Sequence, residues 1–86
     1  MGWDVGSPKK PIKVIYTDHA LDRLESRGIS KEEVEEALRN PDSRMPGAQD
    51  NTRRVHKRMP NGRSLQVIYK PKGTIVVIIT ASWREK

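Results

Sequence analysis

The chain has 86 residues, which is enough for one domain with a thin core. It contains no cysteine, so a disulfide framework and thiol catalysis are excluded, and no apolar stretch approaches the ~20 residues that cross a membrane. The N-terminus also lacks the apolar segment of an export signal, so we expect a cytoplasmic protein with no membrane partner.

The net charge is +6, and it is unevenly distributed. Residues 17–42 hold eight acidic and four basic side chains, whereas residues 51–84 hold eight Lys or Arg and no Asp or Glu. A small domain with one basic side suggests a polyanionic partner or an acidic protein partner. The alternative interpretation is a solvated surface that happens to be basic.

The N-terminal half predicts a short strand and two helices. Residues 1–11 are rich in Gly, Pro and Lys and predict a flexible tail, and residues 12–16 alternate weakly as a first strand. Thr17-Asp18 offers an N-cap for a helix over residues 18–27. A capping-box pattern then begins a second helix over residues 30–40.

The C-terminal half predicts strands. Residues 75–79 form one β-branched run, so a strand over 74–83 is expected to be central and covered on both faces. Residues 52–59 have no strongly apolar face and predict an edge strand. The remaining predictions are a strand over 64–69, a turn over 70–73, and a loop over 42–51 with a brief strand around Arg44-Met45.

These elements predict a single α+β domain over residues 12–86. Strands joined by short turns pair antiparallel, so we expect the two helices to pack on one face of a four- or five-stranded antiparallel sheet. The expected order is strand, helix, helix, and then three or four strands.

Two segments carry a family resemblance. They are YTDHALDRLESRGISKEEVEEALRNPD and RRVHKRMPNGRSLQVIYKPKGTIVVIITASWR. The first contains the pattern T-x-H-A-x-x-R-x-x-x-R-G-I, and together they resemble a small prokaryotic family of uncharacterised domains. That family resembles the RelE/ParE superfamily of toxins from toxin–antitoxin pairs, through its element order and its closing strand hairpin.

The resemblance implies a β-α-α-β-β-β fold with a concave basic face. In the superfamily this face serves ribosome-dependent mRNA cleavage or gyrase inhibition, and a small antitoxin protein wraps the toxin. RelE-type nucleases usually carry an Arg near the position of Gln66. They often end the last strand with a His-Arg or Lys-Arg pair, where this chain has Trp83-Arg84, so only Arg84 corresponds.

Cleavage of RNA by its 2′-hydroxyl needs proton-transfer groups and cations for the charge of the phosphorane. Imidazole exchanges protons near neutral pH, and the chain has two histidines. The candidate catalytic residues are His19, Arg23, His56 and Arg84. Arginine and lysine bind phosphates and aromatic rings stack on bases, so the candidate nucleic-acid-binding residues are Arg53, Arg54, Lys57, Arg58, Arg63, Tyr69 and Trp83.

Each candidate also has a plainer interpretation. His19 is suited to capping or packing in a first helical turn, and His56 is equally suited to be an inert surface histidine. Basic side chains on an edge strand block aggregation, and Tyr69 and Trp83 are suited to core packing. No metal site and no cofactor are expected, because the histidines are far apart and the carboxylates cluster on the second helix.

We therefore predict a toxin-like RNA-binding domain whose partners are RNA or the ribosome and an antitoxin protein. We hypothesise that it is a ribosome-dependent, metal-independent mRNA endoribonuclease. The alternative is a non-catalytic module of the same fold that binds an acidic protein or nucleic acid through its basic face.

Overall fold

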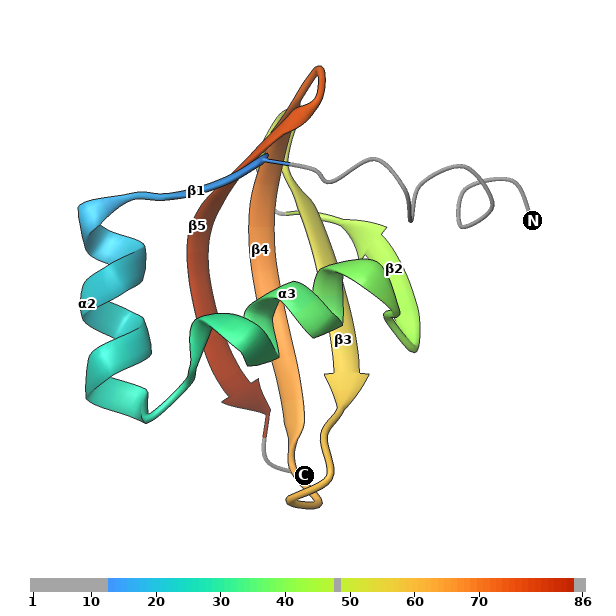
Figure 1. Ribbon diagram of the computed structural model, residues 1–86. Helices are drawn as coiled ribbons and strands as arrows, with labels where there is room; N and C mark the ends of the chain where they lie inside the picture. The colour runs from blue at the N-terminus through green and yellow to red at the C-terminus, as the bar shows by residue number, and fades with distance from the viewer. Residues whose placement is uncertain (1–12, 48, 85–86) are drawn as a thin grey trace.

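A computed structural model describes residues 13–47 and 49–84 of the chain (Figure 1). The predicted tail over residues 1–11 lies outside the described residues. The α+β class is confirmed. In chain order the elements are β1 (Lys13–Tyr16), α2 (Asp18–Arg27), α3 (Lys31–Arg39), β2 (Ser43–Pro46), β3 (Arg53–Arg58), β4 (Ser64–Lys72) and β5 (Ile75–Arg84).

The helices begin and end where their capping residues predict. Thr17 Oγ1 accepts a hydrogen bond from the Ala20 amide at 3.0 Å, which satisfies a free donor in the first turn of α2. Gly28 ends α2 with a left-handed φ of 66°. Ser30 and Glu33 form both hydrogen bonds of the predicted capping box at the start of α3.

The five strands form one mixed sheet in the order β1-β5-β4-β3-β2. Pairs joined by short connections are antiparallel, but β1 pairs parallel with β5, so the prediction of an antiparallel sheet is wrong at this edge. No short turn joins β1 to β5, because the helices and three strands separate them, and their relative direction is therefore not constrained by a hairpin.

The predicted order of a strand, two helices and then three or four strands is met with four. The β-α-α-β-β-β order that the resemblance implies has one strand fewer than the structure. The brief strand predicted around Arg44-Met45 is confirmed as β2. It pairs with β3, so the prediction that residues 52–59 form an edge strand is wrong. The central strand is β4, with β5 beside it. Composition alone did not predict the order of these strands in the sheet, because a short edge strand such as β2 takes its register from its neighbour and needs no apolar pattern of its own.

The predicted turn over residues 70–73 begins too early. Strand β4 continues to Lys72, and Pro71 pairs with Val76 of β5. On the other side of β4, the pairing with β3 ends at Tyr69. Pro71 therefore lies where β4 pairs with β5 only. Proline has no backbone N–H to donate, but at this position no hydrogen bond to β3 is lost. The turn itself is confined to Gly73 and the residue after it, and Gly73 has a φ of 63°.

Both helices cover the same face of the sheet. Helix α2 packs on β5 and β1, and α3 crosses β4 and β3 (Figure 1). The buried core lies between these layers and consists of Ala20, Leu24, Ile29, Val34, Ala37, Val55, Met59, Leu65, Val67, Ile78 and Ala81. No described helix or strand covers the opposite face, which we call the helix-free face. Among the described helices, none is long and apolar enough to span a membrane.

Candidate functional site

The helix-free face gathers polar side chains from three adjacent strands. His56 of β3 lies opposite Gln66 of β4, which in turn lies opposite Ser82 of β5. One pair further along, Ser64 lies between Arg58 and Arg84. Alternate residues of a strand share a face, so Arg54 also lies here, two residues before His56.

Gln66 links the candidate histidine to the candidate arginine. His56 Nε2 lies 2.7 Å from Gln66 Oε1, and Arg84 Nη1 donates to the same oxygen at 3.1 Å. A guanidinium only donates, so the contact from Arg84 identifies the amide oxygen. His56 Nε2 must then carry a proton, and in the neutral imidazole Nδ1 keeps its lone pair. The arrangement therefore leaves Nδ1 as the position that can accept a proton.

Arg54 is only partly satisfied. Its Nε atom is buried and has no hydrogen-bond partner among the described residues. Strand register places Arg54 between Met45 of β2 and Ile68 of β4, so its stem lies against apolar neighbours. An unpaired buried donor costs roughly 1–3 kcal/mol, and such groups mark positions where a ligand can supply the acceptor.

One carboxylate lies beside this face. Asp42 Oδ2 accepts from the Arg58 amide at 2.7 Å, and the Asp42 amide donates to the His56 carbonyl at 2.8 Å. Asp42 thus binds the backbone of β3 near the C-terminal end of that strand. The strands β3, β4 and β5 themselves contain no acidic residue, so the helix-free face keeps its positive charge.

The other predicted catalytic pair lies in the helical layer. His19 and Arg23 occupy successive turns of α2, and Arg23 Nε donates to His19 Nε2 at 3.3 Å. His19 is exposed. The structure therefore brings His56 together with Arg84 on the helix-free face and pairs His19 with Arg23 on α2.

Hydrogen bonds to β5 account for two residues of the first segment's pattern, Thr17 and Arg27. Thr17 Oγ1 donates to the Ile78 carbonyl at 3.1 Å, and Arg27 Nη1 donates to the Ala81 carbonyl at 2.8 Å. Trp83 Nε1 donates back to the Arg27 carbonyl at 2.9 Å. These three bonds join α2 to β5.

Trp83 and Arg63 lie together on the helix-covered face. Trp83 is opposite Leu65, a core residue, and packs against the core. The Arg63 guanidinium carbon lies 4.7 Å from the centroid of the Trp83 ring. Lys57 of β3 also pairs with Leu65, so Lys57 lies on the helix-covered face as well. Three of the predicted nucleic-acid-binding residues are therefore separated from Arg54 and Arg58 by the sheet.

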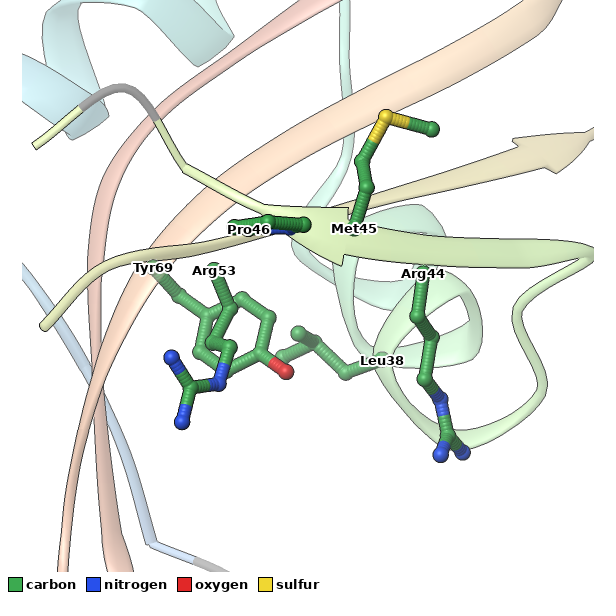
Figure 2. Close-up of a pocket in the computed structure, with 6 residues that line it drawn as sticks. All are labelled: Leu38, Arg44, Met45, Pro46, Arg53 and Tyr69. Carbon is green, nitrogen blue, oxygen red and sulfur yellow. The ribbon is translucent and has the colours of Figure 1, made fainter.

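Arg53 and Tyr69 line a pocket of about 460 Å³ on the same helix-covered face. They are opposite each other on β3 and β4. The other lining residues are Leu38 of α3 and Arg44, Met45 and Pro46 of β2 (Figure 2). The sheet thus divides the predicted binding residues into two groups, one on each face.

Gln66 was not among the predicted site residues. It interrupts β4 as a polar residue between Leu65 and Val67, both of which are buried. Alternation within a strand placed Gln66 on the opposite face from them, and this pattern was the available signal. Its role as a shared acceptor depends on β3 and β5, which the pattern of one strand does not show. Among residues 13–47 and 49–84, no three His, Asp or Glu side chains gather as a metal site.

A second polar cluster joins β1 to α3. The Tyr16 hydroxyl donates to Glu35 Oε2 at 3.4 Å, and Lys31 Nζ lies 5.2 Å from the ring centroid. Burial, followed by the charge of Glu35 and its hydrogen bond, raises the pKa of Tyr16 from 10.0 to about 12. The protonated phenol is therefore favoured in the folded state.

We expect an absorbance titration at alkaline pH to show a phenol that ionises near pH 12, and Tyr16→Phe to remove it. The folded pKa lies above the unfolded value, so this contribution to stability is complete below pH ~10 and is lost as the pH rises towards 12. Glu35→Gln should lower the midpoint only in part, because burial is the largest cause. A wild-type protein whose phenols all ionise near pH 10 would contradict this assignment.

Comparison with known proteins identifies the family. No curated protein and no solved structure matches the chain. A family model described as "Domain of unknown function (DUF4258)" matches residues 16–83, which include both helices, the whole segment from β2 to β4, and nearly all of β5. The chain therefore belongs to the DUF4258 family of domains of unknown function.

Proposed function

We propose that this domain binds single-stranded RNA on its helix-free face and cleaves it there. The observation that carries the proposal is the shared contact of His56 and Arg84 with Gln66 Oε1, at 2.7 and 3.1 Å, between the cations Arg54 and Arg58. Phosphate binding by arginine forks supplies affinity, and the imidazole supplies a proton acceptor beside the phosphate. The toxin-like relation to RelE/ParE and an antitoxin partner are part of this proposal.

The chemistry follows from the fixed orientation of the imidazole. His56 Nδ1 takes the proton of a ribose 2′-hydroxyl, and the 2′-oxygen attacks the adjacent phosphorus. The bond from phosphorus to the 5′-oxygen breaks, and that oxygen takes a proton from water. The products are a 2′,3′-cyclic phosphate and a 5′-hydroxyl. Arg54 and Arg84 are placed to stabilise the charge that develops on the phosphoryl oxygens.

A specific observation favours a second candidate function. Gln66 occupies the centre of the face, near the position where RelE-type nucleases usually carry an Arg, and a neutral amide supplies no charge to the phosphorane. The alternative is therefore a non-catalytic module that binds RNA or an acidic protein through the same face.

The test is a cell-free translation assay with purified protein and with the triple variant Arg54→Ala/His56→Ala/Arg58→Ala. We expect the wild type to arrest translation and cut mRNA, and the variant to do neither. Arg39→Gln, which removes an exposed charge on α3 in the helical layer, is the control. If the wild type binds RNA without cutting it, the non-catalytic function holds. If it neither cuts nor binds at micromolar concentration, the RNA proposal is wrong.

A further inference from the structure

We propose that the pocket on the helix-covered face binds a nucleoside monophosphate, with its phosphate on Arg53 and Arg44 and its base against Tyr69. The inference goes beyond the proposed RNA cleavage, because the pocket and the His56–Gln66–Arg84 contact lie on opposite faces of the sheet.

The size and lining of the pocket suit such a ligand. A volume of about 460 Å³ falls in the range of roughly 300–1,000 Å³ typical of small-molecule sites. Leu38, Pro46 and the ring of Tyr69 supply an apolar surface, and Figure 2 shows the side chains of Tyr69 and Leu38 on the same side of β2. A flat base fits this surface better than an aliphatic chain, because every base can stack on an aromatic face.

Two of the lining residues are charged, and both are arginines. Arg44 is opposite Val55 and Arg53 is opposite Pro46, so the two arginines are diagonal neighbours on the β2–β3 pair. Figure 2 shows both side chains directed to the same side of β2, while the Met45 side chain is directed away from them. No Asp or Glu is among the described lining residues.

Two arginine forks around an apolar surface select a phosphate over a single negative charge. Each guanidinium offers parallel N–H donors that match phosphate oxygens. Adenosine lacks the phosphate and inorganic phosphate lacks the base. Each should therefore make only one of the two proposed sets of contacts, either with Tyr69 or with the two arginines. The nucleotide can be a free monophosphate or the 5′-terminal nucleotide of an RNA, and both present the same chemistry.

The experiment is a titration of the full chain with AMP, followed by amide resonances in ¹⁵N-labelled protein. We expect AMP to shift resonances around Leu38, Arg44 and Tyr69, and adenosine and inorganic phosphate to bind at least about tenfold more weakly. Arg53→Gln should weaken AMP binding about tenfold or more, whereas Lys72→Gln, an exposed charge outside the pocket, should leave it unchanged. Arg53 is exposed, so its replacement should not disturb folding.

A second variant tests the ring. Tyr69→Leu keeps an apolar side chain and should weaken AMP and adenosine by a similar factor, with folding confirmed by the unchanged dispersion of the spectrum. A titration with 5′-phosphorylated tetra-adenylate separates the two sources. Tighter binding than AMP assigns the pocket to RNA ends, and equal binding assigns it to the free nucleotide.

Three results would overturn the inference. They are an absence of shifts up to ~10 mM AMP, equal affinities for AMP and adenosine, and shifts confined to the helix-free face. A 10 mM limit corresponds to a binding free energy of less than ~3 kcal/mol in magnitude, too weak for two charge-assisted contacts and a stacked base. Because the readout contains no RNA cleavage, failure of the ribonuclease proposal leaves this result intact, and the reverse also holds.

Discussion

Replacing His56 by glutamine is expected to lower the rate of the proposed RNA cleavage at saturating RNA by at least ~100-fold, since removal of a general base typically costs 10²–10⁴-fold. The affinity for RNA should change only a few-fold, because the proposed phosphate contacts of Arg54 and Arg84 remain. The two quantities are measured separately, the rate by single-turnover cleavage of a labelled oligonucleotide and the affinity by fluorescence anisotropy.

Arg54→Gln is the matched comparison on the same strand and face. It should weaken RNA binding and reduce the slope of log affinity against log salt by about one, because one phosphate contact is lost. If His56→Gln and Arg54→Gln change the cleavage rate and the affinity in the same proportions, His56 is a binding residue and the imidazole has no separate role in catalysis.

Gln66→Leu separates the positioning of His56 from its chemistry. Loss of the shared oxygen leaves Nε2 of His56 and Nη1 of Arg84 without the acceptor that orients them. We expect a slower cleavage rate with an altered pH profile, because the imidazole is no longer held in one tautomer. Gln66→Glu keeps an acceptor at the same distance, so it should retain the orientation of the ring and shift the pH profile by its charge.

Leu65→Ala is expected to destabilise the domain by about 3 kcal/mol, within the range of 2–5 kcal/mol for buried leucines. Leu65 is 0% exposed and lies on the central strand, opposite Lys57 on one side and Trp83 on the other. A domain of this size has a total stability of roughly 5–15 kcal/mol, so the transition midpoint should fall by roughly 12–24 °C. Urea denaturation followed by Trp fluorescence measures the change.

Leu21→Ala is the control for this substitution. Leu21 is 38% exposed on α2, so the same chemical change should alter stability by less than ~0.5 kcal/mol. Similar losses for the two variants would mean that the core is not centred between α2, α3 and β4. An unchanged slope against urea in both variants would show that each acts on stability and not on the extent of unfolding.

The sequence was most informative where local contacts decide structure. The capping residues Thr17, Ser30 and Glu33 bond groups within three residues of themselves, so the bounds of α2 and α3 could be read directly. The β-branched run of β5 identified a strand inside the sheet, but the prediction that it is central and covered on both faces is wrong, because β4 is central and the described helices cover one face only. These signals need no knowledge of the rest of the chain, because a cap or a run of branched residues acts within one or two turns.

The sequence was least informative where partners are distant in the chain. The parallel pairing of β1 with β5 joins residues about sixty positions apart, and β2 takes its place at the edge only through β3. The turn after β4 was predicted too early because proline is common in turns. Pro71 is tolerated within β4 because β3 no longer pairs with β4 at this point.

The division of the basic residues was also a result of tertiary structure. By itself, the sequence determined that residues 51–84 are basic and that β3 alternates Arg53 with Arg54 between two faces. It did not determine which face the helices cover, nor that Gln66 joins His56 to Arg84. Helix packing and strand register decided both, because they depend on the joint burial of apolar side chains from five elements, and no single segment carries that information.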